Sequence, residues 1–383
     1  MITCPACRES TVVERVYEKS GVPAINNRVY LTAKEAAAAP IGRIELGSCL
    51  SCDFVFNAAF DERLAEYTEE YNAARSHSPT FSTYLDSVVD ICSEGLVQGT
   101  CVLEIGCGDG SFLEKLYNLT GAFCDGYDVS ASQRPTGSGL RFHQKIFKPE
   151  VDGAEYEFLA LRHVLEHIPA PRAFLEKLLA ADTLAKGGQI YIEVPDVGWI
   201  LENATFFDIT YEHCNYFCRA SLNQLLESLG FINIRIQNVF DGQYLMLRGV
   251  YDPDIAVERR TEVAASHNDF TPLHEHRKKW IEFIRSMPYV SIWGASGKGA
   301  ILLSDLDKST REHIRLVIDT NSRKQGFFLP TSAKLVEAPE ALRGVEPPQT
   351  VLVMNPIYES EIQDTLAALE VYCRTVVIGK NSH

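Results

Sequence analysis

The sequence predicts an α/β protein built from a small cysteine-bounded module and two units in which strands and helices alternate. Paired cysteines near the N-terminus indicate the module. A strand, a glycine-rich loop and a helix then follow one another at 100–119 and again at 289–306. Such alternation favours a parallel sheet covered on both faces. We divide the chain into a module at 1–58, a helical segment with the first α/β domain at 59–253, a helical connector at 254–286 and a smaller α/β domain at 287–383.

Hydrophobic periodicity predicts the remaining elements of each unit. In the first unit, we expect helices at 61–71, 81–92, 173–185 and 220–230, and strands at 124–130, 157–163 and 189–195. An antiparallel pair at 232–240 and 243–251 closes this unit around the turn residues Asp241 and Gly242. In the second unit, we expect strands at 289–296, 314–320, 350–356 and 374–379, and helices at 298–306 and 359–372.

The composition excludes several classes of protein. Of 383 residues, 46% are hydrophobic and 23% charged, which rules out a disordered, collagenous or coiled-coil chain. The net charge of −15 argues against a nucleic-acid partner, which would need a basic face. The sequence has neither an apolar run near the roughly 18 residues of a membrane span nor a secretory signal pattern. We therefore expect a cytoplasmic protein without a membrane partner; the oligomeric state stays open.

Four of the eleven cysteines form two C-x-x-C pairs, Cys4 with Cys7 and Cys49 with Cys52. Each pair can aim two thiolates at one ion, so together they predict a tetrahedral four-thiolate zinc site. The alternatives are chance pairing and a redox role, for which one pair would suffice. A closed shell of four protein ligands leaves no open position, so we expect a structural zinc.

A glycine-rich loop with an acidic residue before it follows the strand that begins near Cys101. The pattern is Glu104-x-Gly106-x-Gly108-x-Gly110, and Asp128 ends the next strand, where a carboxylate can bind ribose hydroxyls. The close spacing of the glycines resembles motif I of class I S-adenosylmethionine (SAM) methyltransferases. An acidic loop also suits a sulfonium cation better than the phosphates of a dinucleotide. A nicotinamide cofactor and a nucleotide-free sheet are the alternatives.

The segment after the fourth strand of this unit carries Arg162, His163, Glu166 and His167. Ligands meet an open α/β sheet at the carboxyl ends of its strands, so we expect Arg162 and His163 at the cofactor edge and His167 near the substrate. The alternative is that some of these side chains only cap or pack the following helix.

Tyr211, Glu212 and His213 form a second polar cluster, placed just before a helix and surrounded by aromatic residues. Methyl transfer to a carbon or a hydroxyl requires a base, and a histidine oriented by a carboxylate can remove the proton. The cluster therefore predicts the acceptor site; a polar surface turn is the alternative.

The smaller α/β unit has its own glycine-rich loop with Gly294, Ser296, Gly297 and Lys298, and Asp319 ends the next strand. Such a loop at a helix start can cradle an anion, although no full Walker pattern is present. We expect it to bind the nucleotide part of a substrate; the alternative is a unit that serves only as a packing scaffold.

In this order, the cysteine pairs, the SAM loop, the Y-E-H segment and the C-terminal loop resemble the sugar C-methyltransferases of deoxysugar pathways over nearly the whole chain. The resemblance implies a class I methyltransferase Rossmann-like core with an N-terminal zinc module and a C-terminal Rossmann-like domain. It also implies methylation at C3 of a nucleotide-linked 4-keto-6-deoxy sugar through an enolate. His213 would be the base and Glu212 would orient it, with His167 near the sugar and Tyr71 lining the site.

The sequence departs from this family at one position. The family commonly has a tyrosine two residues before the E-H pair, where this chain has Thr210, while Tyr211 directly precedes Glu212. The acceptor atom therefore stays open between carbon, as the family implies, and an oxygen or nitrogen of a sugar or other small metabolite. A non-catalytic protein or oxidoreductase that binds a dinucleotide in the C-terminal loop is the rival from another class.

Overall fold

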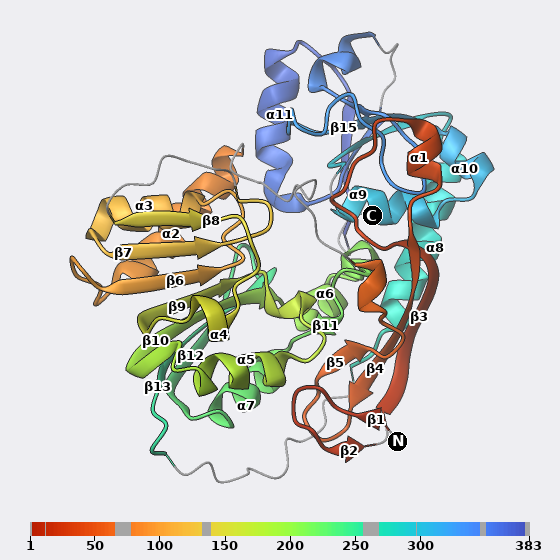
Figure 1. The fold of residues 1–383 in the computed structure, drawn as a ribbon. Helices are drawn as coiled ribbons and strands as arrows, with labels where there is room; N and C mark the ends of the chain where they lie inside the picture. The colour runs from red at the N-terminus through yellow and green to blue at the C-terminus, as the bar shows by residue number, and fades with distance from the viewer. Residues whose placement is uncertain are drawn as a thin grey trace.

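The computed structural model describes residues 2–11, 13–65, 78–131, 139–255, 268–295, 297–344 and 350–379. Their elements form a central domain, an N-terminal module and a C-terminal domain (Figure 1). Residues of all three parts line one cavity. No helix among these residues is both long and apolar enough to cross a membrane.

The central domain is built on a seven-stranded sheet in the order β12-β13-β10-β9-β6-β7-β8. All its strands run parallel except β13, which pairs antiparallel with both β10 and β12. This is the sheet of the class I methyltransferase fold, as the sequence predicts. Its strands are β6 (Cys101–Ile105), β7 (Phe123–Tyr127), β8 (Leu140–His143), β9 (Tyr156–Arg162), β10 (Leu184–Pro195), β12 (Phe231–Val239) and β13 (Tyr244–Tyr251).

Helices cover both faces of this sheet, because the central strands are apolar on both sides. In β9, Phe158 and Ala160 pack in one hydrophobic cluster while Leu159 and Leu161 pack in another. The first cluster lies under α2 (Pro79–Ser93) and α3 (Ser111–Thr120), and the second under α5 (Pro171–Ala180) and α7 (Arg219–Glu227). Shorter elements are α4 (Pro149–Asp152), α6 (Val197–Glu202), η1 (Glu62–Leu64), η2 (Leu165–His167) and η3 (Phe206–Asp208).

The helix expected at 173–185 is shorter in the structure. Helix α5 ends at Ala180, and Leu184 already begins β10. Asp182, between them, has a φ of 52° and so breaks the helix, and the apolar run that follows is buried as strand. Hydrophobic periodicity alone does not distinguish a helix from a buried strand in a short apolar stretch.

The N-terminal module contains a four-stranded antiparallel sheet in the order β11-β5-β4-β3, besides the small β1–β2 pair. Its outer strand β11 comes from the central domain and pairs with β5. The elements are β1 (Ile2–Thr3), β2 (Ser10–Thr11), β3 (Val13–Pro23), α1 (Ala33–Ala37), β4 (Ile41–Cys49), β5 (Val55–Asn57) and β11 (Asn215–Tyr216). Strand β11 begins two residues after His213, so backbone pairing of β5 with β11 joins the module to the predicted acceptor segment.

The C-terminal domain is a five-stranded parallel sheet in the order β16-β15-β14-β17-β18, the predicted Rossmann-like unit. Its strands are β14 (Val290–Trp293), β15 (Ile314–Ile318), β16 (Val336–Glu337), β17 (Thr350–Val353) and β18 (Arg374–Val377). Its helices are α8 (Thr271–Ser286), α9 (Gly297–Asp305), α10 (Lys308–Glu312), η4 (Pro339–Gly344), η5 (Pro356–Tyr358) and α11 (Glu359–Ala368).

The module and the C-terminal domain share one hydrophobic core. Tyr17 and Ile44 of the module, Phe206 of the central domain, and Trp280 and Ile301 of the C-terminal part belong to the same buried cluster. A buried ion pair between Lys19 Nζ and Asp305 Oδ2, 2.8 Å apart, joins β3 to α9. The long strands of the module therefore brace the C-terminal domain along one side of the molecule (Figure 1).

Candidate active site

A cavity of about 1020 Å³ lies where the three parts meet. Its lining includes Asn26 of the module, Gly108 and His213 of the central domain, and Gly294 and Asp319 of the C-terminal domain. Pockets that bury small ligands commonly reach this size.

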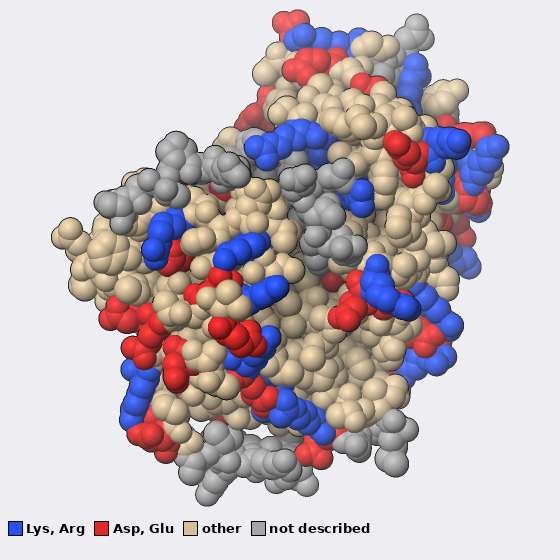
Figure 2. All heavy atoms as spheres, viewed as in Figure 1, with Lys and Arg blue, Asp and Glu red and all other residues tan. Residues whose placement is uncertain are grey.

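On the face drawn in Figure 2, acidic and basic side chains alternate over the surface without a broad patch of one sign.

The glycines of the loop after β6 are required by its backbone. Gly106, Gly108 and Gly110 have φ values of 76°, 54° and 78°, a region that side chains disfavour. A Cβ on Gly106 would lie 2.5 Å from Val164 Cγ2, and one on Gly110 would lie 2.5 Å from the Phe142 ring. A Cβ on Gly108 would meet open space, so backbone rather than side chain faces the cavity at this position.

Asp128, at the end of β7, is fixed beside this loop. Its Oδ2 accepts the backbone N–H of Gly108 at 3.0 Å, and its Oδ1 accepts the N–H and hydroxyl of Ser130 at 2.7 and 2.6 Å. The carboxylate also lines the cavity. Each carboxylate oxygen has two lone pairs, and Oδ1 already accepts two hydrogen bonds, so Oδ2 can accept one more from a ribose hydroxyl.

We call the glycine loop after β6, Asp128 and Glu104 the cofactor cradle. The Glu104 side chain is buried at its base, 1% exposed. Burial raises its pKa to about 8; Arg162 opposes the rise, and Asp109 and Asp128 add to it. Glu104 Oε1 lies 3.7 Å from Arg162 Nη1, and Oε2 has no hydrogen-bond partner among the described residues. This concentration of acidic groups and the open carboxylate oxygen fit a cationic cofactor such as SAM.

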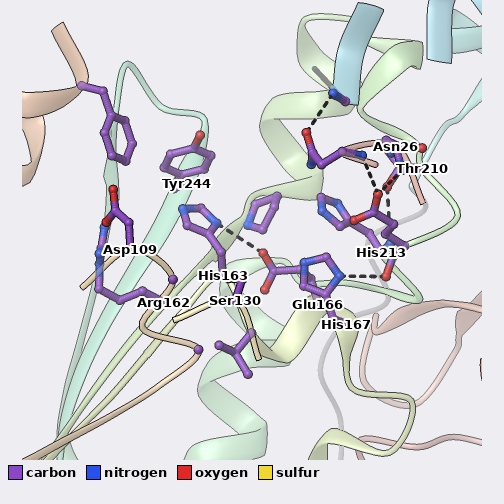
Figure 3. Close-up of a pocket in the computed structure, with 18 of the residues that line it drawn as sticks. Asn26, Asp109, Ser130, Arg162, His163, Glu166, His167, Thr210, His213 and Tyr244 are labelled. Atoms are coloured by element: carbon purple, nitrogen blue, oxygen red, sulfur yellow. Dashed lines mark hydrogen bonds and ion pairs between the residues drawn. The ribbon is translucent and has the colours of Figure 1, made fainter. Parts of the chain in front are cut away.

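The acceptor side of the cavity holds two histidines and a glutamate. Ring nitrogens of His167 and His213 and a carboxylate oxygen of Glu166 all lie within 4.8 Å of one another. The two imidazoles meet edge to face, with centroids 4.9 Å apart (Figure 3). His167 Nδ1 lies 3.0 Å from the carbonyl oxygen of Glu212. That carbonyl can only accept, so Nδ1 carries the proton and Nε2 is the basic nitrogen of the neutral ring.

The structure places the residues just before His213 in different roles. Thr210 Oγ1 accepts the N–H of His213 at 3.3 Å and lines the cavity. Glu212 Oε1 accepts the backbone N–H groups of Asn26 and Asn27, the second at 3.3 Å. This carboxylate therefore joins the acceptor segment to the module; that it also orients His213 stays a prediction.

Tyr211 does not take the place that the sequence predicts for it. The side chain is fully buried outside the cavity lining, against the Phe60 ring. Its hydroxyl accepts the N–H of Asp61 at 2.7 Å and donates to the Asp61 carbonyl at 3.2 Å. The Y-E-H segment turns at this point, so Glu212 and His213 face the cavity while Tyr211 packs against the module. The structure thus gives Tyr211 packing and hydrogen-bond contacts outside the cavity lining, and a part in catalysis stays a prediction.

The C-terminal loop reaches the same cavity through Gly294, Gly297, Lys298 and Asp319. Gly299 packs so closely under the loop that a Cβ would lie 2.1 Å from the Gly294 carbonyl oxygen. The Lys298 ammonium is bound by Asp208 of the central domain, 2.6 and 2.7 Å from its carboxylate oxygens. Two further predicted site residues, Tyr71 and Ser296, lie outside the described residues.

The sequence did not predict some of the residues that line the cavity. Glu166 stood in the segment considered above but was not selected, because a glutamate after a strand also suits a helix cap. Asn26 and Asn27 lie in an irregular stretch of the module with no motif around them. Their contribution depends on the fold, which brings the module to the acceptor segment.

The four predicted zinc ligands come together. Cys4, Cys7, Cys49 and Cys52 form a cluster, with Sγ–Sγ distances of 3.7 Å for Cys4–Cys52 and for Cys7–Cys49. A tetrahedral ion with Zn–S bonds of about 2.3 Å has sulfur atoms about 3.8 Å apart. The cluster therefore fits a zinc ion, which would cross-link the two knuckles.

Comparisons with known proteins match two parts of the chain. Residues 71–236 match the family model of a methyltransferase domain, and residues 259–377 match that of a C-methyltransferase C-terminal domain. The C-methyltransferase NovU of Streptomyces niveus is 28% identical over 327 residues, which cover 77% of this chain and 76% of NovU.

Solved methyltransferase structures are similar to less than half of the chain. The plantazolicin methyltransferase BpumL is 15% identical, with a TM-score of 0.36 over 46% of this chain and 86% of its own. The magnesium protoporphyrin IX methyltransferase of Synechocystis PCC 6803, solved with SAM, is 18% identical, with a TM-score of 0.34 over 45% of this chain and 80% of its own.

The seven-stranded sheet, the glycine loop and the two domain matches define the chain as a SAM-dependent methyltransferase. The C-terminal domain match and the similarity to NovU support a C-methyltransferase family.

Proposed function

We propose that the protein transfers the methyl group of SAM to C3 of a nucleotide-linked 4-keto-6-deoxy sugar. The observation that carries this proposal is the convergence of three sites on one cavity: the acidic cradle at Glu104, the imidazole pair at His167 and His213, and the C-terminal loop at Gly294. A cofactor, a base and a nucleotide-binding loop are the parts that this reaction needs.

The cofactor fits the cradle after β6, with its ribose hydroxyls on Asp128 and its positive charge near Glu104. The nucleotide of the sugar fits the C-terminal domain, where Asp319 directly follows β15 and backbone groups of Gly294 and Gly297 line the cavity. The sugar would then extend between the domains towards His213. In this arrangement, the acceptor carbon faces both the methyl group and the base.

The neighbouring keto group makes the C3 proton acidic, so a base of near-neutral pKa can remove it. His213 takes this proton, and the electron pair of the C–H bond becomes the enolate. The enolate carbon forms a bond to the methyl group while the bond from sulfur to methyl breaks, and S-adenosylhomocysteine leaves. His167, anchored through Nδ1 to the Glu212 carbonyl, hydrogen-bonds the sugar through Nε2.

The test is to incubate the full-length enzyme with methyl-labelled SAM and thymidine- or guanosine-linked 4-keto-6-deoxyhexoses. We expect label on C3 of at least one sugar. In D₂O without SAM, we also expect exchange of the C3 proton, and loss of this exchange in His213→Asn. Label on oxygen or nitrogen without exchange would instead identify an O- or N-methyltransferase, and no label on any sugar would refute the substrate class.

A further inference from the structure

A chain of buried charged side chains connects the cofactor cradle to the acceptor histidines. Arg162 Nη1 lies 3.7 Å from Glu104 Oε1, and Arg162 Nε lies 3.4 Å from Glu193 Oε2. His163 Nε2 lies 2.9 Å from Glu193 Oε1, and His163 Nδ1 lies 3.2 Å from Glu166 Oε1. From Arg162 through Glu193 and His163 to Glu166 the charges alternate, and the chain ends beside His167 and His213 (Figure 3).

His163 is held in an unusual conformation at the centre of the chain. Its φ is 55°, a left-handed value that few residues other than glycine adopt. Its backbone N–H donates to the Glu193 carbonyl at 2.8 Å. The ring packs edge to face on Tyr244, with centroids 4.5 Å apart. Backbone strain of this kind persists where the surroundings fix it, and it concentrates at functional sites.

Both ring nitrogens of His163 face carboxylates, Glu193 on one side and Glu166 on the other. An ionised carboxylate only accepts hydrogen bonds, so Nδ1 carries a proton towards Glu166 Oε1. Nε2 lies 2.9 Å from Glu193 Oε1 outside hydrogen-bond geometry, and the negative charges of the two carboxylates favour a proton there as well, which makes the ring an imidazolium. Burial by itself would lower the pKa of His163, but the hydrogen bonds and charges of Glu166 and Glu193 outweigh it, and the pKa is raised.

Glu166 is the member of this chain of side chains that lies beside the acceptor histidines. It is 1% exposed, and its Oε2 has no hydrogen-bond partner among the described residues. Burial opposes its ionisation, but the hydrogen bond from His163 and the nearby imidazoles of His167, His163 and His213 lower its pKa. The other groups around the pair are Tyr244 on the His163 ring and Cys214, whose Sγ lies 3.4 Å from the Glu166 carbonyl oxygen.

We propose that Glu166 is a positioning residue that keeps a negative charge beside the acceptor imidazoles, and that His163 is a positioning residue that fixes Glu166 there. The inference deepens the proposed function, because it rests on a histidine acting as the base. When His213 takes a proton, it becomes an imidazolium, and the Glu166 carboxylate stabilises that charge without accepting the proton. Glu212, bound to the module backbone, would then orient the segment rather than carry this charge.

The test compares Glu166→Gln and His163→Asn with Glu150→Gln, which removes a carboxylate from an exposed ion pair with Lys177. Glutamine has the shape of glutamate without its charge, and asparagine tolerates the left-handed backbone of His163. We expect kcat to fall at least about tenfold in both site variants, because base catalysis commonly contributes a hundredfold or more. The KM for SAM should stay within about twofold of wild type in Glu166→Gln.

Two readouts separate this role from a general loss of structure. The acidic limb of the kcat/KM profile should move to lower pH in Glu166→Gln, because the base loses a neighbouring negative charge. Histidine-selective NMR of the full-length protein, assigned with His163→Asn, should show His163 as an imidazolium near neutral pH. In Glu166→Gln, its titration should move to lower pH.

A neutral His163, or a Glu166→Gln variant with the wild-type kcat and pH profile, would overturn the inference. The NMR titration needs no substrate, so it decides the inference even if no sugar is methylated and the proposed function fails. Should His163→Asn fail to fold, Glu166→Gln still gives both readouts, with the signals of His167 and His213, which also lie beside Glu166, assigned separately from His167→Asn and His213→Asn.

Discussion

The ammonium of Lys298 lies 2.6 and 2.7 Å from the two carboxylate oxygens of Asp208, which joins helix α9 of the C-terminal domain to η3 of the central domain. The same ammonium lies 5.6 Å from the centre of the Trp199 ring and 5.4 Å from that of Phe207. Lys298 therefore serves as a contact between domains at the edge of the cavity, in addition to any contact with an anion.

Replacing Lys298 by methionine should weaken substrate binding at this contact between domains more than it lowers the free energy of unfolding. The pair is partly exposed, so its loss should lower the free energy of unfolding by only about 1 kcal/mol. In the proposed arrangement the nucleotide sugar contacts both domains, so its KM should rise about tenfold, a loss near 1.4 kcal/mol, while the SAM affinity stays constant.

Steady-state kinetics and isothermal titration with SAM measure these two effects, and Lys308→Met on the neighbouring helix α10 is the matched control. A SAM affinity that falls as much as the sugar KM rises would show that the junction also shapes the cofactor cradle.

Asp128→Ala should weaken SAM binding. The carboxylate fixes Gly108 and Ser130 and stands where the ribose hydroxyls would lie, and a hydrogen bond to a charged group contributes about 1.5–3 kcal/mol. We expect the Kd of SAM to rise between about tenfold and a hundredfold. Isothermal titration measures it, with Asp86→Ala, from an exposed pair with Lys115, as the control. An unchanged Kd would place the ribose elsewhere.

SAM binding should depend on pH through Glu104. Its pKa of about 8 means that the carboxyl is largely protonated at neutral pH in the free protein, and a bound cation favours the ionised form. Binding then releases a proton, so affinity should increase as pH rises from 6 to 8. Titrations at pH 7 in buffers of different ionisation enthalpy measure the released proton, and Glu104→Gln should abolish the release.

The same group has the opposite effect on the stability of the free protein. Unfolded glutamate ionises near pH 4.3, so the folded state binds the extra proton between that pH and about 8. The contribution of Glu104 to stability is thus present below pH 4.3 and is lost as pH rises through 8. At pH 8, Glu104→Gln without SAM should melt no lower than wild type. A clearly lower Tm would mean that the charge of Glu104 supports the fold.

Local sequence patterns predicted the individual motifs of this protein, but only the fold shows which residues lie together in the site. The glycines at 106, 108 and 110 and the cysteine pairs were readable because each motif needs fixed residue types at fixed spacing. Tyr211 lies outside the cavity lining, unlike Glu212 and His213, because adjacent residues in an irregular segment face different directions. Packing against Phe60 and Asp61 decides the direction of Tyr211. The roles of His163 and Glu166 depend on Glu193, thirty residues further on in the neighbouring strand, so their pairing follows from strand register.

The cysteine cluster and the acceptor segment are connected through few residues, so metal removal should affect methyl transfer selectively. The knuckle at Cys49 and Cys52 leads into β5, whose Phe56 and Val55 pair with Asn215 and Tyr216 of β11. The N–H of Asn57 also donates to the Cys214 carbonyl at 2.8 Å, next to His213. A zinc ion at the cluster would thereby hold one edge of the acceptor site in place.

We therefore expect chelation, or Cys52→Ser, to reduce kcat at least about tenfold and to lower Tm, because a structural zinc contributes directly to folding. The glycine loop and Asp128 lie on β6 and β7, outside the module, so the Kd of SAM should stay within about twofold of wild type. Zinc analysis, thermal melting and SAM titration check this, with Cys373→Ser as a thiol control outside the cluster. Full activity in a protein with well under one zinc per chain would refute the zinc assignment and its link to His213.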